Sequence, residues 1–221
     1  MSTTLSDSGL LLASGNIIDL KAAMPTTGTY TAGDIVLEST TGTRVSGWKR
    51  QTAGSGNVLG TDWVYFSDGS VLMTAQNTTS GTSIDFTGIP SWVKRVTVML
   101  NGVSGNGTSV FQIQVGSGSI STAGYASQAW GATGSGVVTT GIILSTTNTA
   151  ANTWTGHVVL TLIGANQWIT SGVLNVDNAT SSGVQIIGKT PSLAGALDRL
   201  RFTTVNGTDT FDAGSVNILY E

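Results

Sequence analysis

Apolar and polar residues alternate with a period of two along much of the second half of the chain. A period of two places successive side chains on opposite faces of an extended strand, so each alternating stretch predicts a β-strand with one buried face. Gly, Asn, Ser and Thr separate these stretches, as expected for turns between short strands. The alternating apolar positions are Val96, Val98 and Leu100; Phe111, Ile113 and Val115; Val158, Leu160 and Leu162; Val184 and Ile186; and Val216, Ile218 and Tyr220.

Several of the opposite strand faces also carry apolar residues, namely Met99, Val159, Ile187 and Leu219. A two-layer sandwich buries only one face of each sheet, so apolar side chains on the other face predict a partner surface such as a subunit interface. Single apolar residues are also common on protein surfaces, and that simpler interpretation stays open.

Helical patterns are rare in this chain. The best candidate runs from Asn16 to Met24 and is barely two turns long. It stops at Pro25 because proline cannot continue a helix. The segment that follows predicts three strands rich in β-branched and aromatic residues. They cover residues 34–38, 45–51 and 62–67, with a turn at 54–57 between the last two.

The clearest hairpin pattern lies near the end of the chain. Residues 199–205 and 208–211 are extended in character and flank Asn206-Gly207, a pair that favours a type I′ turn. The last strand pattern, residues 215–220, is expected to be paired into a sheet.

Together these patterns predict an all-β protein of three parts. Residues 1–24 are interpreted as an N-terminal attachment or shaft segment, residues 25–75 as a small β module, and residues 76–221 as a C-terminal β-sandwich of the jelly-roll kind. The module offers few large apolar residues for its length, so association with other chains would help to stabilise it.

Composition adds that the chain is folded and weakly charged. Of its 221 residues, 39% are hydrophobic and 10% are charged, whereas roughly 25% are charged in ordinary domains. Disordered chains show the reverse balance. The 30 glycines are about twice the usual share. With the many Thr, Ser and Asn residues, they indicate a surface hydrated through hydroxyl and amide groups.

Several classes of partner are disfavoured by the same composition. No Cys is present, which excludes disulfides and thiolate metal sites. The nine basic residues are scattered and the net charge is −3, so we expect no nucleic-acid site. No apolar run approaches the ~20 residues of a membrane helix, and the first residues lack the basic region of a secretory signal. We therefore expect no membrane insertion.

Catalytic patterns are missing as well, and we expect no enzymatic activity, cofactor or metal. The nucleophile pattern G-x-S-x-G does not occur, and His157 is the single histidine that a catalytic triad or zinc site could use. A glycosidase needs two carboxylates across the scissile bond. The late acids are interpreted instead as ion-pair or turn residues; they are Asp177, Asp198, Asp209 and Asp212. Residues 183–190 match the phosphate-loop sequence G-x-x-x-x-G-K-[ST]. The four middle residues have the alternation of a strand, whereas a phosphate loop needs a strand before it and a helix after it, so we interpret the match as chance.

Receptor binding is the chemistry that remains. Saccharide recognition usually stacks an aromatic side chain on the apolar face of a sugar ring and surrounds it with amides, hydroxyls and acids. Aromatic residues in glycine-rich stretches are expected to lie on exposed, adaptable segments. The candidate receptor contacts are Tyr125, Gln128, Trp130, Trp154 and Trp168. The alternative is that each tryptophan folds back to cover the edge of the sandwich or a seam between subunits. The tryptophans assigned to packing are Trp48, Trp63 and Trp92.

Two stretches resemble parts of bacteriophage and prophage tail-fibre proteins. The first, residues 81–104, has the core Ile84-Asp-Phe-Thr-Gly-Ile-Pro-Ser-Trp-Val-Lys-Arg95. The second, residues 195–221, is similar to the C-terminal end of the same proteins and includes Leu200-Arg-Phe-Thr-Thr-Val-Asn-Gly207. Shorter pieces are similar to small β modules of fibre and tailspike shafts; they are Ala32-Gly-Asp-Ile-Val36, Gly47-Trp48 and Gly60-Thr-Asp-Trp63.

The resemblance implies an intertwined homotrimer in the virion tail, synthesised in the host cytoplasm. It implies that the N-terminus joins tail or baseplate proteins and that the C-terminal domain adsorbs to a host surface glycan or outer-membrane protein. Two other hypotheses stay open. One is a tailspike that depolymerises polysaccharide, and the other is a purely structural virion protein.

Overall fold

The computed structural model describes residues 10–38, 47–65, 70–131, 134–178 and 183–221. Every regular element among these residues is a β-strand, which confirms the all-β prediction. The chain divides into two compact units, residues 1–71 and residues 72–221. Within the described ranges no helix is long and apolar enough to cross a membrane.

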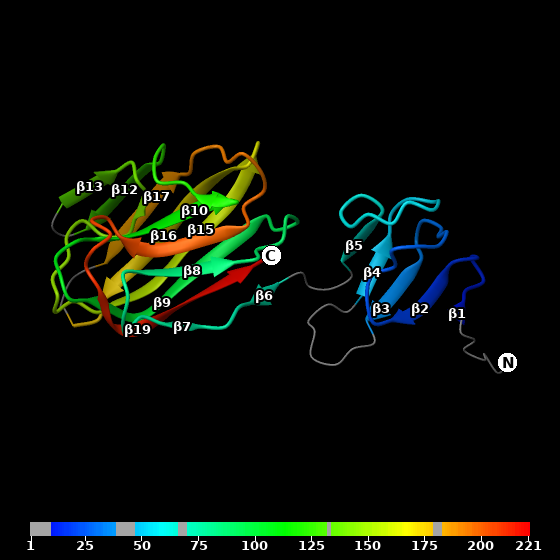
Figure 1. The fold of residues 1–221 in the computed structure, drawn as a ribbon, viewed down its shortest axis with the longest axis horizontal. Coiled ribbons are helices and arrows are strands. Elements are labelled where there is room, and N and C mark those ends of the chain that lie inside the picture. The colour runs from blue at the N-terminus through cyan, green and yellow to red at the C-terminus, as the bar shows by residue number, and fades with distance from the viewer. Residues whose placement is uncertain (1–9, 39–46, 66–69, 132–133, 179–182) are drawn as a thin grey trace. The chain divides into compact units, whose positions relative to one another are not determined.

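Unit 1 is a single five-stranded sheet in which the strands follow one another in chain order (Figure 1). The β2–β3 pair is parallel, and the other neighbours are antiparallel. The predicted strands at 34–38, 45–51 and 62–67 correspond to β3, β4 and β5, apart from their residues outside the described ranges. The strands are β1 (Leu10–Leu11), β2 (Ile17–Lys21), β3 (Ile35–Glu38), β4 (Gly47–Arg50) and β5 (Trp63–Tyr65).

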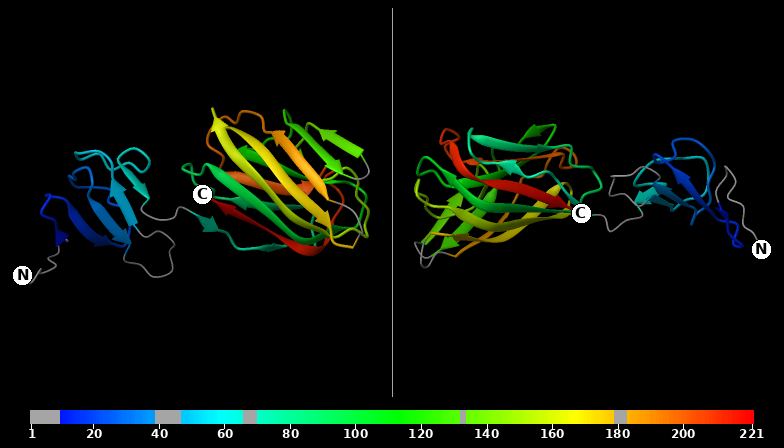
Figure 2. Two further views of the ribbon diagram at one scale, coloured as in Figure 1. Left: turned by 180° about the vertical axis from the view of Figure 1, so that it is seen from behind. Right: turned by 90° about the horizontal axis from the view of Figure 1, so that it is seen from below.

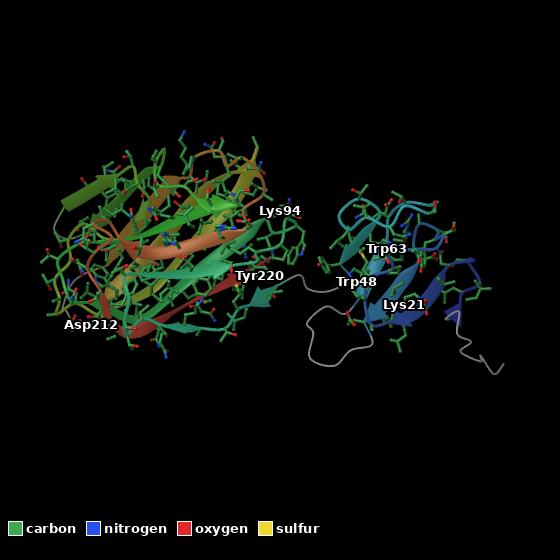
Figure 3. All side chains as sticks on the ribbon, in the orientation of Figure 1. Lys21, Trp48, Trp63, Lys94, Asp212 and Tyr220 are labelled. Atoms are coloured by element: carbon green, nitrogen blue, oxygen red, sulfur yellow. The ribbon has the colours of Figure 1, made fainter. Side chains whose placement is uncertain are left out.

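The core of unit 1 is small and aromatic. Val36, Trp48 and Trp63 are buried together on β3, β4 and β5, and Figure 3 labels the two tryptophans. Tyr30 meets the Trp63 ring edge-on, with 4.8 Å between ring centroids. The assignment of Trp48 and Trp63 to packing is therefore confirmed, and the unit has a core of its own.

A buried arginine organises the loop between β4 and β5. The Arg50 guanidinium donates hydrogen bonds to the carbonyl oxygens of Thr52, Gly54 and Gly56. It also lies over the Trp63 ring, with 5.4 Å from Cζ to the centroid. A buried guanidinium is tolerated only when its donors are satisfied, so Arg50 fixes the course of the predicted turn at 54–57.

The helix predicted from Asn16 to Met24 is wrong, because the described segment contains strand β2. Ile18 on β2 lies opposite Ile35 on β3. The backbone N–H of Ile17 donates to the Asp34 carboxylate at 2.9 Å. A two-turn helix gains little from its own hydrogen bonds, whereas pairing with β3 satisfies the backbone.

Strands β1 and β2 therefore belong to the same sheet as the strands of the module that follows them. The structure differs here from the three-part division at 24 and 75, because its units meet between Val71 and Leu72.

Unit 2 is a two-layer β-sandwich (Figures 1 and 2). In the larger sheet the order is β13-β12-β17-β16-β15-β9-β19-β6, and β7 also pairs with β19. Its nine strands are β6 (Val71–Leu72), β7 (Gln76–Asn77), β9 (Arg95–Gly105), β12 (Ala126–Gly131), β13 (Gly134–Val138), β15 (Trp154–Gly164), β16 (Gln167–Val176), β17 (Val184–Lys189) and β19 (Phe211–Tyr220).

The smaller sheet has the order β11-β10-β18-β8, and β14 also pairs with β10. Its five strands are β8 (Ser83–Thr87), β10 (Phe111–Ser117), β11 (Ser119–Ile120), β14 (Ile142–Ile143) and β18 (Arg199–Thr204).

The two sheets enclose one hydrophobic core. Phe111 on β10 and Phe202 on β18 belong to the smaller sheet, and Phe211 on β19 belongs to the larger one. The Phe202 and Phe211 rings stack with 5.2 Å between centroids, and Phe111 lies 5.9 Å from Phe211. All three are buried, so these aromatic contacts join the two layers.

The predicted alternation holds through the sandwich. In β9, β10, β15, β17 and β19 the apolar positions that alternate are buried, with the exception of the half-buried Leu162. Residues 183–190, the phosphate-loop match by letters, lie mainly in β17.

The hairpin predicted across Asn206-Gly207 is wrong. β18 pairs with β10 and β8, whereas β19 pairs with β9, β7 and β6. The chain turns at Gly207, which has a φ of 68°, and the Asn206 side chain accepts hydrogen bonds from the N–H groups of Thr208 and Asp209. The turn chemistry is therefore present, but it sends the chain from one sheet to the other.

Candidate binding surfaces

Three of the five predicted receptor contacts are buried inside unit 2. Tyr125 is 2% exposed, and its hydroxyl accepts a hydrogen bond from the Val115 N–H at 2.8 Å. Burial raises the pKa of Tyr125 to about 12. Trp154 and Trp168 are 3% and 2% exposed, and Trp154 Nε1 donates to Asn148 at 2.9 Å. These side chains present no open face to a receptor, which favours the packing interpretation for them.

The other two predicted contacts, Gln128 and Trp130, lie together on β12. They alternate with the buried Ser127 and Ala129, so both point to the outer side of the larger sheet. Trp130 is 37% exposed. The segment Ala126–Gly131 is thus a strand rather than a loop, and it carries these two side chains to a sheet face.

That face is unusually apolar for the outside of a sandwich. We call it the apolar outer face. It is formed by apolar side chains that point away from the core on β9, β12, β13, β15, β16, β17 and β19. Its members are Met99, Trp130, Val137, Val159, Ile169, Val173, Ile187 and Leu219. The apolar residues expected on second strand faces are all among them.

The strand register arranges the apolar outer face into cross-strand rows. Directly opposed residues in antiparallel strands have neighbouring side chains, so each row is continuous. The first row runs through Val137, Gln128, Ile187, Ser171, Val159, Thr97 and Leu219. The second runs through Ser135, Trp130, Gln185, Val173, His157, Met99 and Asn217.

The two rows contain no Asp, Glu, Lys or Arg, and His157 is their one titratable residue. Charges begin in the next row, where Lys189 lies opposite Ile169 and Arg95 lies opposite Thr161. The side chains within the two rows are otherwise apolar, hydroxyl or amide groups. Apolar and polar side chains alternate along each row, the apolar members of the two rows are diagonal neighbours, and the middle of the apolar outer face carries no Asp, Glu, Lys or Arg.

The smaller sheet presents a different outer surface. A hollow, which we call the polar hollow, opens over β8, β10 and β18 and is lined almost entirely by hydroxyl, amide and guanidinium groups. The lining residues are Thr82, Ser83, Gln112, Gln114, Thr122, Thr140, Arg201, Thr203, Thr204, Val205, Asn206 and Gly207.

Two glutamines on β10 are fixed at the bottom of the polar hollow. Gln112 and Gln114 are 2% and 6% exposed. Gln114 Nε2 donates to the Thr140 carbonyl oxygen at 2.8 Å, and the Thr140 hydroxyl donates to Gln112 Oε1 at 2.9 Å. Buried amides are held in one orientation when they are hydrogen-bonded, so these groups are already positioned.

Arg201 forms part of the wall of the polar hollow, and an ion pair with Asp85 holds its guanidinium. Arg201 Nε and Nη2 donate to the two Asp85 carboxylate oxygens, each at 2.7 Å. The hydrogen bond to Asp85 raises the pKa of Arg201. The pair is bidentate, the strongest geometry for these groups, and it leaves the wall without net charge.

The aspartates in the last part of the chain mostly accept hydrogen bonds from backbone N–H groups and neighbouring side chains. Asp198 pairs with Arg199 at 2.7 Å, and that hydrogen bond lowers the pKa of Asp198. Asp209 accepts from the Asn206 amide at 2.7 Å, which lowers the pKa of Asp209. Asp177 accepts from the Thr155 hydroxyl. In the described part of the chain no group of three His, Asp or Glu residues is placed to hold a metal.

The polar hollow was not predicted from the sequence. One signal was present, because Gln112 and Gln114 alternate with the core positions of β10. Nothing in the sequence brings Thr140 or Asn206 next to them. Comparison of the chain with protein-family models, curated proteins and solved structures finds no match. The surfaces of the chain itself are therefore the basis for a functional assignment.

Proposed function

We propose that the chain is a non-enzymatic adsorption protein of the tail-fibre kind, which acts as a homotrimer in a virion tail. The apolar outer face of unit 2 carries the proposal. It is supported by the resemblance of residues 81–104 and 195–221 to tail-fibre proteins. In this role unit 2 binds a bacterial surface receptor, and unit 1 faces the tail or baseplate.

The apolar outer face is suited to a second copy of the same chain. Unit 2 already encloses a core between its sheets, so exposure of Val137, Val173 and Ile187 on the other side is not needed for folding. Their exposed fractions are 66%, 51% and 48%. Contiguous exposed apolar surface is typical of protein interfaces, and interface centres are depleted in charge. Another copy offers the matching surface, which is equally apolar and equally uncharged.

Three copies would turn weak receptor contacts into firm adsorption. Binding sites held in one particle act at a high effective concentration, so avidity can exceed single-site affinity by about 10²–10⁴-fold. The threefold number itself comes from the resemblance to tail fibres. Homo-oligomers usually close with point-group symmetry, and an apolar surface that every copy of the chain carries can be buried in such a closed assembly.

Unit 1 supports a separate attachment role. It has its own buried cluster around Trp48 and Trp63 and its own loop anchor in Arg50. A module with its own core can contact one partner while unit 2 contacts another.

The acids favour binding over hydrolysis as the activity of unit 2. A glycosidase requires one carboxyl that donates a proton and a second that attacks or activates water. Asp198 is engaged by Arg199 and Asp209 by Asn206, with the pKa of each acid lowered. A lowered pKa is unsuitable for a general acid, which must hold its proton at neutral pH.

Adsorption to bacteria tests the proposal. Fluorescently labelled full-length chain would be mixed with a panel of bacterial strains, and cell-bound label would be measured by flow cytometry. We expect saturable binding to a subset of strains that unlabelled chain competes away, with no release of reducing ends from the surface polysaccharide. Failure to bind any strain, or release of reducing ends, would refute the proposed role.

A further inference from the structure

The polar hollow differs from ordinary strand surfaces because its polar side chains are buried. Gln112, Gln114 and Thr203 all belong to the outer side of the smaller sheet, yet each is less than 7% exposed. The Thr203 hydroxyl donates to the Thr82 carbonyl oxygen at 2.7 Å. Polar groups are rarely buried on an outer face unless other groups surround them. They therefore form a recess instead of a flat surface.

The recess is rigid where a ligand would rest. Gln114 is held by the Thr140 carbonyl, and Gln112 by the Thr140 hydroxyl and by the Thr204 carbonyl at 3.3 Å. β10 and β18 are adjacent strands, and Gln114 lies directly opposite Arg201 in their register. Groups fixed before binding cost less entropy when a ligand arrives, so the recess is organised for recognition.

The chemistry of the lining selects the class of ligand. Asp85 already neutralises Arg201 through two hydrogen bonds, which leaves Arg201 Nη1 as a donor without an acceptor among the residues that the structure describes. An anionic ligand would have to compete with Asp85 for the guanidinium. A ligand with many uncharged hydroxyl groups can use this donor without that competition. It can also use the hydroxyl groups of Thr82, Ser83 and Thr122, which make no hydrogen bond to the residues that the structure describes.

We propose that the polar hollow is a binding site for an uncharged saccharide, whose hydroxyl groups are recognised by Arg201 Nη1 and by the hydroxyl groups of Thr82, Ser83 and Thr122. The inference rests on the proposed adsorption function and names the receptor class for it. The hollow offers no aromatic platform, because its single apolar lining side chain is Val205. Binding at one site is therefore weak, and it depends on several copies acting together.

The test uses the full chain and a panel of immobilised oligosaccharides. The panel pairs neutral hexose and N-acetylhexosamine oligosaccharides with uronate-containing counterparts. We expect binding to at least one neutral oligosaccharide, with an affinity that changes little between low and high salt, because no charge attraction is involved. Binding confined to uronate-containing oligosaccharides, and weakened steeply by salt, would overturn the proposal.

Two substitutions test whether the saccharide binds in the polar hollow. Thr122 is an exposed lining residue, so Thr122→Trp fills the space without disturbing the core. Arg201→Gln removes the free donor. We expect each change to weaken neutral saccharide binding about tenfold or more, equivalent to about 1.4 kcal/mol. Thr61→Trp, at an exposed position in unit 1, is the matched control and should bind like the unchanged chain.

The outcomes separate this proposal from the proposed function. Unchanged neutral saccharide binding in both hollow variants would overturn the assigned site. Strain-specific adsorption without any neutral saccharide binding would also overturn it, while leaving the adsorption function standing. Hollow-dependent saccharide binding in a chain that adsorbs to no strain would support the site and refute the adsorption function.

Discussion

The two outer faces of the unit 2 sandwich cover the same core but have opposite surface chemistry. The larger sheet presents two rows without Asp, Glu, Lys or Arg, in which Val137, Val173 and Ile187 are exposed. The smaller sheet presents a recess of amides, hydroxyls and the Asp85–Arg201 pair. An uncharged apolar surface suits contact with another protein surface, whereas a recess of fixed polar groups suits a small polar ligand.

The same alternation of apolar and polar positions is thus compatible with two very different outer surfaces. In both sheets the inward positions are apolar, as the Phe111, Phe202 and Phe211 contacts require. The outward positions are free of that requirement. They carry exposed apolar side chains on the larger sheet and polar side chains on the smaller sheet. We therefore expect substitutions on opposite sides of unit 2 to alter the proposed assembly and the proposed receptor binding separately.

The largest expected effect comes from placing a charge in the apolar outer face. Ile187 lies between Gln128 and Ser171 in the first row and is 48% exposed. In Ile187→Asp the carboxylate would be buried between subunits without a partner, at a cost on the order of several kcal/mol per copy. We expect assembly to weaken by about 100-fold or more, measured by sedimentation velocity, while circular dichroism shows an unchanged β fold.

Leu20→Asp is the matched control for that substitution. Leu20 is 64% exposed on β2 of unit 1, so the same change of charge is made away from the apolar outer face. Its assembly should equal that of the unchanged chain. Equal assembly of Ile187→Asp and Leu20→Asp would contradict the interface and remove the contrast between the two faces.

The next effect is on the core that both faces share. Phe211 is 2% exposed and packs against Phe111 and Phe202. Phe211→Ala should reduce the free energy of unfolding of unit 2 by about 3–5 kcal/mol, because a large cavity is left between the sheets. Denaturant unfolding followed by circular dichroism checks this value. A loss below about 1 kcal/mol would mean that the rings do not join the layers.

The smallest expected effect is on thermal stability at acidic pH, and it comes from Asp209, whose partner Asn206 lines the polar hollow. The Asn206 amide and the Ser109 N–H donate to Asp209 and lower its pKa. A carboxyl whose folded pKa is lowered stabilises the fold above its unfolded pKa of about 3.9, and this contribution is lost as the pH falls through the folded pKa. The thermal midpoint of Asp209→Asn should therefore fall less steeply than that of the unchanged chain below about pH 4.

Asp212→Asn is the control for the acid effect. Asp212 is exposed on β19 and accepts no hydrogen bond from the residues that the structure describes. Asp212→Asn therefore changes the net charge by the same amount as Asp209→Asn without removing a hydrogen bond from the described structure. The same slope in all three proteins would show that the Asn206–Asp209 contact contributes nothing to stability.

The fold could be predicted from the sequence where local pattern and tertiary packing agree. The alternation around Val98, Ile113 and Val158 placed the right residues in the core, because a half-buried strand requires it. Prediction failed at Asn16–Met24 and at Asn206-Gly207. In the first case pairing with β3 outweighs a weak local helix preference. In the second the local turn is present, but packing of Phe211 on the opposite sheet decides where the chain goes.

The candidate sites could be predicted only in part. Apolar residues on second strand faces, such as Met99 and Ile187, indicated an extra surface directly from their spacing. Tyr125 lies between Gly124 and Ala126, and Trp154 lies between Thr153 and Thr155, which suggested exposure, yet the closure of the sandwich buries both of them, as it buries Trp168. The polar hollow joins residues far apart in the chain, so its existence depends on the pairing of β10 with β18 and β14.

Light scattering of the unchanged chain at micromolar concentration tests the central claim most directly. That claim is that the apolar outer face joins copies of the chain and leaves the polar hollow open for a receptor. The expected molar mass is three times that of a single chain, and it should persist on dilution through the micromolar range. A molar mass equal to one chain would contradict the assembly and, with it, the role assigned to the apolar outer face.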